Sequence, residues 1–194
     1  VFPKLTDKEI KETKRQKEVM AMALLKPNKY LYPLIGDSKE HKYAYGKVTD
    51  TSSVFYISTT EVTNLQYRTF LFDLLINEDK ETFIKAKPHQ YLWLNAPGHA
   101  KTKDMKDNYF SNKKYNDYPV VNVTPEGAEL YCKWLTNIVE ISNGKIIARL
   151  PYENEWIKAA RHKGIAPVYP WPIDSIQNRV GCHLANFCIQ KRAD

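Results

Sequence analysis

Glycine and cysteine are both scarce in this chain, and each scarcity excludes a class of site. Only 7 glycines occur among the 194 residues, so a glycine-rich phosphate loop of the nucleotide-binding kind is not expected. The 3 cysteines, Cys132, Cys182 and Cys188, are too few for a disulfide scaffold, and they leave the redox compartment open. The 5 histidines lack the spacing of zinc ligands.

No apolar run in the sequence approaches the roughly 18 residues that a membrane-spanning helix needs, so we expect no transmembrane segment. The first residue is Val1, and no charged stretch followed by an apolar one precedes it. We expect either that a leader has been removed or that the sequence is a fragment of a longer polypeptide.

Positive charge is in excess, with 29 Lys and Arg against 22 Asp and Glu and a net charge of +7. The lysines are spread along the chain, with local pairs such as Lys113 and Lys114, and no Arg-rich block or known nucleic-acid motif occurs. We therefore expect no nucleic-acid partner. A solvated basic surface or an acidic partner protein accounts better for the charge.

Capping patterns and hydrophobic periodicity predict four helices. The first 25 residues form a charged helix in which Thr6 and Glu9 have capping-box spacing. A second helix is predicted over 64–76, a third from Pro125 onward, and a fourth over 153–162. The second begins after Thr63 with Gln66 three residues later, and Thr124 is placed to cap the third.

Strands and loops separate these helices. Enrichment in Val, Phe, Tyr and Ile predicts a strand at 53–59, and "YPVVNV" predicts another at 118–123. Residues 26–53 are predicted to be loop, and residues 77–118 form a long, aromatic, ordered loop region without periodicity. We divide the chain into a charged N-terminal arm and loop at residues 1–45 and a mixed α/β domain at 46–194.

Three segments in order carry a family resemblance. They are "YISTTEVTNLQYRTF" (56–70), "YPVVNVTPEGAELYCKWL" (118–135) and "RLPYENEWIKAAR" (149–161). Together they resemble the formylglycine-generating enzyme, or sulfatase-modifying factor, domain family over residues 53–194. The resemblance implies a mixed α/β, formylglycine-generating-enzyme-like (C-type-lectin-like) fold that is poor in regular secondary structure and rich in ordered loops.

The third segment has a structural explanation. Glu153 and Glu155 lie in the first turn of the predicted helix, where the helix dipole favours negative charge. Trp156 is then expected to face a core. The family usually has Thr where this chain has Tyr152, so the helix must be capped by another group. We expect the two glutamates to build the helix start and not to act as catalytic acids.

Enzymes of the family use two thiols near the end of the domain to bind Cu(I), a soft ion suited to thiolates. Cys182 and Cys188 do not match that pair, because their spacing differs and the "HLAN" between them aligns with an earlier family segment. We expect ordinary buried thiols or a structural disulfide there, and Cys132 in the core. The later family segments are absent because the sequence stops at Asp194, so we expect the C-terminal part of the domain, with the catalytic region, to be missing.

The "AN" segment implies a structural calcium site. In the family the Asn side chain and the next carbonyl bind Ca²⁺ with an Asp further on, and such hard oxygen ligands suit this ion. Carried over, the metal ligands are the Asn186 side chain, the Phe187 carbonyl and the Asp194 carboxylate, with the remaining ligands beyond the chain. The alternative is that Asn186 bonds the backbone of a turn.

The version "STTEVTNLQYR", with a long aromatic insertion before "YFSNKKYNDYPVV", is similar to gliding-motility and type IX secretion lipoproteins of this fold. This implies a non-catalytic scaffold on the periplasmic face of the outer membrane. Its partners would be proteins of an envelope complex, and a lipid anchor would lie outside the visible chain. We expect contacts through the aromatic loop 85–118 and the N-terminal arm.

Two other functions stay open. The first is a copper-dependent oxidase that converts a substrate cysteine to formylglycine, with its catalytic part beyond residue 194. The second is a basic adaptor for acidic polymers.

Overall fold

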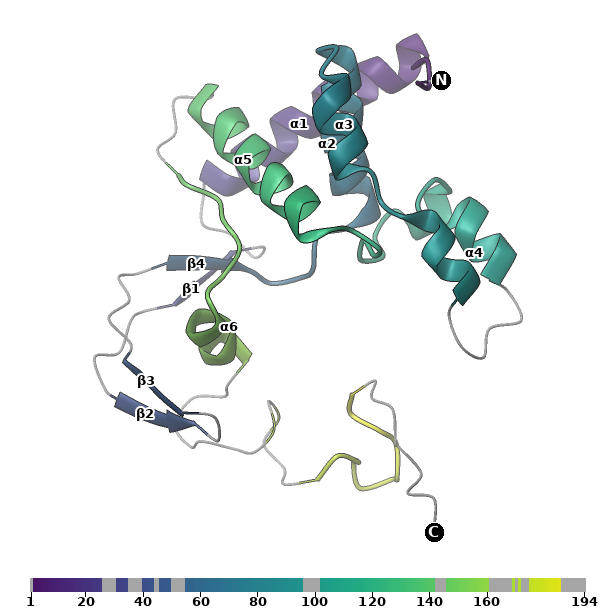
Figure 1. Ribbon diagram of the computed structural model, residues 1–194. Coiled ribbons are helices and arrows are strands. Elements are labelled where there is room, and N and C mark those ends of the chain that lie inside the picture. Colours follow the sequence, from purple (N-terminus) through teal and green to yellow (C-terminus); the bar gives the residue numbers. More distant parts are fainter. Residues whose placement is uncertain are drawn as a thin grey trace. The chain divides into compact units, whose positions relative to one another are not determined.

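The computed structural model describes residues 2–25, 31–34, 40–43, 46–49, 55–95, 102–141, 146–160, 169, 171 and 175–185. Across these ranges the regular structure is mostly helical, with four strands of four residues each (Figure 1). Helices combined with few and short strands agree with the expected mixed fold of low regularity. The chain divides into two compact units: unit 1 comprises Val1–Pro33 and Tyr56–Leu150, and unit 2 comprises Leu34–Phe55 and Pro151–Asp194.

Helices dominate unit 1. Four of them pack on one another, with α2 against α1 and α3, and α5 against the same two helices (Figure 1). A fifth helix, α4, packs against the 3-10 helix η1. The bounds are α1 Asp7–Leu25, α2 Asn64–Ile76, α3 Lys80–Ala86, η1 Gln90–Asn95, α4 Thr102–Asn108, η2 Lys113–Tyr115 and α5 Pro125–Ile141.

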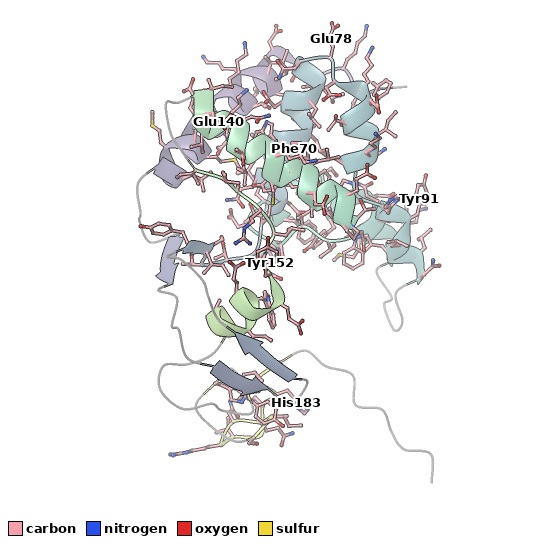
Figure 2. The ribbon with its side chains drawn as sticks, turned by 60° about the vertical axis from the view of Figure 1, so that its left-hand side comes forward. Phe70, Glu78, Tyr91, Glu140, Tyr152 and His183 are labelled. Carbon is pink, nitrogen blue, oxygen red and sulfur yellow. The ribbon has the colours of Figure 1, made fainter. Side chains whose placement is uncertain are left out.

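The core of unit 1 is a cluster of aromatic side chains from α2 and α5. Phe70 is 0% exposed, and its ring meets the ring of Tyr67 edge-on at 5.4 Å between centroids. The Tyr67 ring stacks on Tyr131 at 5.4 Å, and Phe70 also contacts Trp134 at 5.5 Å. Figure 2 labels Phe70 among these helices. Because such rings bury ~150–250 Å² each, this cluster supplies much of the hydrophobic stabilisation of the unit.

A buried carboxylate joins α1 to the other helices. Asp73 on α2 accepts hydrogen bonds from the Lys17 ammonium at 2.9 and 3.0 Å and from the indole nitrogen of Trp134 at 2.8 Å. The partners supply both a counter-charge and a hydrogen-bond donor, which a buried carboxylate needs. The N-terminal helix therefore packs on helices of its own chain. The boundary at residue 45 stays a prediction.

The predicted caps are confirmed. The Thr6 N–H donates to Glu9 Oε2 at 2.8 Å, and the Glu9 N–H donates back to Thr6 Oγ1 at 3.3 Å. Thr63 and Gln66 form a complete capping box at the start of α2. At α5, Thr124 Oγ1 accepts from the third residue of the helix at 3.0 Å. These caps satisfy donors that every helix start leaves unpaired.

Short strands occupy the segment predicted as loop at 26–53, so that prediction was wrong where the structure describes it. β2 (Glu40–Tyr43) and β3 (Gly46–Thr49) pair antiparallel, with Glu40 opposite Thr49. β1 (Leu31–Leu34) pairs with β4 (Phe55–Ser58), and β4 confirms the strand predicted at 53–59. Strands of four residues are too short to show a clear alternating pattern in the sequence. They form because they pair with a neighbouring strand.

Two further predictions are corrected around the aromatic segment. Residues 77–118 were predicted as loop, but they contain α3, η1, α4 and η2. Asp79 caps the start of α3 by accepting a hydrogen bond from the Thr82 N–H at 3.1 Å. The helix was not predicted because the apolar residues of this short segment show little helical periodicity. The strand predicted at 118–123 is an isolated bridge between Thr63 and Pro119 in the structure. The two bonds of this bridge run from the Asn64 N–H to the Tyr118 carbonyl and from the Val120 N–H to the Val62 carbonyl, and the pairing ends where α2 begins at Asn64.

Unit 2 contains α6 (Glu153–Ala160), the helix predicted from the third motif. The Tyr152 N–H donates to Glu155 Oε2 at 2.8 Å, so the acidic half of a capping box is present even though Thr is replaced by Tyr. Glu155 is buried, which agrees with a structural role. Trp156 is 60% exposed, and the expectation that it faces a core was therefore wrong. Glu155 takes the buried position on this turn.

Candidate functional site

The residues proposed for calcium lie outside the described part of the chain. This holds for Asn186, Phe187 and Asp194, and also for Cys188. Within the ranges that are described, no three His, Cys, Asp or Glu side chains gather in a way that could hold a metal ion. The calcium site therefore stays a prediction.

The two described cysteines have different surroundings. Cys182 is exposed, and its N–H donates to the Asn178 side chain at 2.9 Å in a tight turn, so the expectation of a buried thiol is wrong for this residue. Cys132 is half-buried on α5, where burial raises the pKa of its thiol. A raised pKa reduces the thiolate fraction and with it the reactivity of Cys132.

Among the described helices, none is long and apolar enough to cross a membrane.

Four aromatic side chains gather where η1 meets the segment from α4 to η2, within the loop predicted to make contacts. The Trp93 ring lies 5.1 Å from the Tyr109 ring, and Tyr109 lies 5.1 Å from Tyr115 and 6.4 Å from Tyr118. Tyr91, labelled in Figure 2, also lies on η1, and the ammonium group of Lys106 on α4 lies over its ring. We call Tyr91, Trp93, Tyr109, Tyr115 and Tyr118 the aromatic platform.

The platform is fixed from beneath by one buried amide. Asn64 is 0% exposed, and its Nδ2 donates to the carbonyl oxygens of Tyr109 at 3.1 Å and Tyr115 at 3.0 Å. Tyr109 is itself buried and donates its hydroxyl to the Pro119 carbonyl at 2.8 Å. Both amide hydrogens of Asn64 are bonded, whereas its Oδ1 is buried without a hydrogen-bond partner among the described residues. Loss of the two amide bonds would leave further buried polar groups unpaired, so they hold the segment in one geometry.

The start of α2 contributes further bonds to the same segment. The Asn64 N–H donates to the Tyr118 carbonyl at 2.8 Å, and the Leu65 N–H donates to the Asn116 carbonyl at 3.0 Å. The first N–H groups of a helix have no partner inside the helix, so the platform segment satisfies them. The "EVTN" motif thus serves as the support of the aromatic segment.

Arg68 completes this support one turn later. Its guanidinium donates to the Phe110 carbonyl at 2.6 Å and to the Asn116 side chain. Burial lowers the pKa of Arg68, and the Glu9 carboxylate on α1 opposes that shift. The segment from 109 to 118 is therefore tied to α2 by Asn64, Leu65 and Arg68.

The outer edge of the platform is open to solvent. Tyr91 is 74% exposed and Tyr118 is 53% exposed, and Leu92 and Leu94 on η1 are also exposed. Rings of this size at a surface, held by a rigid support, are typical of protein interfaces. The arrangement can bind an apolar surface with little loss of side-chain freedom, because its inner members are already packed.

Two lysines lie over rings of the platform. The Lys106 ammonium is 5.2 Å from the centroid of Tyr91, and the Lys114 ammonium is 4.6 Å from the centroid of Tyr115. The Lys114 pKa is raised, first by its bond to Tyr115, so this cation stays protonated over the physiological range. Lys106 also pairs with Asp107 at 2.8 Å. The platform therefore combines apolar rings with positive charge.

Sequence reasoning placed contacts in this loop but missed Asn64 and Arg68. Their bonds reach 45 and 42 residues along the chain, and such distant partners leave no periodic signal. The available signal was an Asn directly after the capping Thr63, at a helix turn where polar side chains find unpaired backbone groups.

The comparisons with known proteins give one positive result. A family model described as "Sulfatase-modifying factor enzyme 1-like domain" matches residues 7–192. The comparison with curated proteins and the comparison with solved structures found no match.

Proposed function

The chain belongs to the sulfatase-modifying factor enzyme 1-like domain family, and within this family we propose that it is a non-catalytic, structural domain of a bacterial envelope assembly. The observation that carries this proposal is the aromatic platform. A buried amide, a helix start and a guanidinium hold the segment 109–118 in place, and the rings of Tyr118 and of Tyr91 on η1 remain exposed. Such support is suited to binding a protein.

We place the assembly in gliding motility or type IX protein secretion, on the periplasmic face of the outer membrane. The form of the "STTEVTNLQYR" segment and the aromatic insertion before residue 118 support this narrower assignment. A lipid anchor would lie outside the visible chain. We also propose that the complete domain has the C-type-lectin-like arrangement of the family.

A structural Ca²⁺ belongs to the same proposal. The chemistry of the proposed donor set fits the ion, since an amide oxygen, a backbone carbonyl and a carboxylate are hard ligands. Asn186, Phe187 and Asp194 would supply these groups. A bound ion would stabilise this part of the domain by joining residues that are eight positions apart.

A second candidate function follows from the matched family, whose description names a modifying enzyme. In this alternative the protein is an oxidase that converts a substrate cysteine to formylglycine. A copper ion would activate the oxygen, and a thiol pair beyond residue 194 would hold this ion. The exposed thiol of Cys182 is the only described one with ready access to solvent.

One purification separates the two functions. The tagged, full-length protein is isolated from the envelope of cells that carry the gene, and its native mass is measured. The same sample is incubated with a cysteine peptide, Cu(I) and oxygen, and the peptide is assayed for an aldehyde. The scaffold predicts a large complex and no aldehyde. Aldehyde formation that depends on copper contradicts it, and so does a native mass equal to that of the single chain.

A further inference from the structure

Positively charged side chains lie next to the aromatic platform, and they indicate which kind of partner the platform would bind. From α4 to Tyr118, residues 102–118 contain four lysines and three aspartates, and no glutamate or arginine. Two of the lysines, Lys106 and Lys114, lie directly over platform rings. The surface therefore offers apolar faces bordered by cations.

We propose that the platform binds an acidic segment of a partner protein, and that this segment also carries apolar side chains. This inference rests on the proposed function. Apolar groups of that segment would cover Tyr91 and Tyr118. Its carboxylates would pair with the ammonium group of Lys114 and would compete with Asp107 for the ammonium group of Lys106. Opposite charges placed around an apolar centre guide association and select the partner.

An anionic membrane is a weaker fit to the same surface. Peripheral membrane binding generally uses an amphipathic helix with a broad apolar face. The helix that packs against η1 here is α4, with the sequence TKDMKDN, and Met105 is its single apolar residue. Asp104 and Asp107 on that helix would face the negative lipid surface together with the lysines. A protein segment can place its charges individually, which a lipid surface cannot do.

Photo-crosslinking in the intact assembly tests the inference. A photoreactive amino acid replaces Tyr91 or Tyr118 in the full-length protein, and exposed Tyr56 on β4 serves as the matched control position. The crosslinked segment is identified by mass spectrometry. We expect crosslinks at the two platform positions to a protein segment that is rich in Asp, Glu and apolar residues, and few at Tyr56.

Charge reversal gives an independent readout. Lys114→Glu is compared with Lys133→Glu, which changes the charge equally on the exposed face of α5. We expect crosslinking from Tyr91 to fall about tenfold in Lys114→Glu, since like charges at a rim repel, and to stay unchanged in Lys133→Glu. An equal effect of both variants contradicts a specific contact.

The outcomes separate this inference from the proposed function. Crosslinks to a basic or uncharged protein segment overturn the inference and leave the scaffold intact. Crosslinks to lipid overturn it in favour of a membrane surface. If Tyr91 and Tyr118 yield no crosslinks while the protein still migrates in a large complex, the platform is not the contact. A single-chain native mass overturns the scaffold as well.

Discussion

The side-chain nitrogen of Asn64 lies 3.1 Å from the carbonyl oxygen of Tyr109, 45 residues further along the chain. This bond connects the first turn of α2 to the aromatic platform, and a second bond from the same nitrogen reaches Tyr115 at 3.0 Å. The family motif and the exposed aromatic surface are thus one structural element. A change at this buried position should affect both stability and the presentation of the rings.

We expect Asn64→Asp to lower the free energy of unfolding by about 2–4 kcal/mol, because two buried carbonyls lose their donor and face a carboxylate instead. Asn77→Ala, at the exposed end of α2, is the control and should cost about 1 kcal/mol or less. Urea unfolding measures both. A loss of the same size in the two variants would contradict a special role for Asn64.

The Asp73 carboxylate should anchor α1. In Asp73→Ala, the Lys17 ammonium and the Trp134 indole N–H lose their acceptor, and we expect a loss of about 3 kcal/mol. The helix α1 should also become more accessible to trypsin at its lysines. Asp79→Ala removes an exposed cap on α3 and should cost about 1 kcal/mol without exposing α1. Unchanged trypsin resistance in Asp73→Ala would refute the anchor.

Tyr152→Thr should strengthen α6. Glu155 already accepts from the backbone N–H of residue 152, and a Thr hydroxyl at that position can accept from the N–H of residue 155 to complete the capping box. We expect slower amide exchange over 153–160, corresponding to about 0.5–1 kcal/mol. Tyr152→Val is the matched control, because Val has the branched shape of Thr but no hydroxyl. Equal protection in both variants would mean that the cap is not the cause.

Stability should fall in alkaline solution because of two buried tyrosines. Burial raises the pKa of Tyr67 and of Tyr131 in the folded protein above the ordinary value of about 10. The folded state then holds these protons more tightly than the unfolded state. The stability that the two protonated tyrosines contribute is therefore fully present below about pH 10. It declines as the pH rises toward their pKa values in the folded protein.

The tyrosine contribution can be measured as the slope of unfolding free energy between pH 9.5 and pH 11. Tyr67→Phe should reduce that slope by up to about 1.4 kcal/mol per pH unit. Tyr56→Phe changes an exposed ring and should leave the slope as it is. An unaltered slope in Tyr67→Phe would show that Tyr67 ionises equally in both states.

The two described thiols should react at different rates. In a Cys188→Ser background, we expect iodoacetamide to label Cys182 at least about tenfold faster than Cys132 at pH 8, because burial raises the pKa of Cys132 and shields it. Peptide mapping over time gives both rates. Equal rates in the folded protein would contradict the half-buried position of Cys132.

The sequence was most informative where structure is decided locally. The caps at Thr6, Thr63 and Thr124 were predicted because each bonds a backbone group three residues away. The strand proposed at 118–123 is only a bridge because its partner segment turns into α2 at Asn64, and Trp156 was misplaced because Glu155 takes the buried position. Periodicity identifies a helix, but it does not decide which of two neighbouring side chains is buried.

The platform could be predicted only as a segment. Its aromatic content was visible, and so was its position between two motifs. The bonds from Asn64 and Arg68 that hold it depend on the tertiary packing of α2 against residues 109–118. Side chains of this kind are found by asking where unpaired backbone groups obtain their partners.

The most direct test of the scaffold is the incorporation of a platform variant into the envelope assembly. Tyr91→Ala combined with Tyr118→Ala removes the two exposed rings, and Tyr56→Ala combined with Tyr152→Ala removes two exposed tyrosines elsewhere. The tagged proteins are extracted from cells, and the fraction in the large complex is measured by size-exclusion chromatography. We expect the platform variant to leave the complex while the control variant stays in it, with circular dichroism showing that both variants are folded. A folded platform variant that remains fully incorporated would contradict the scaffold proposal.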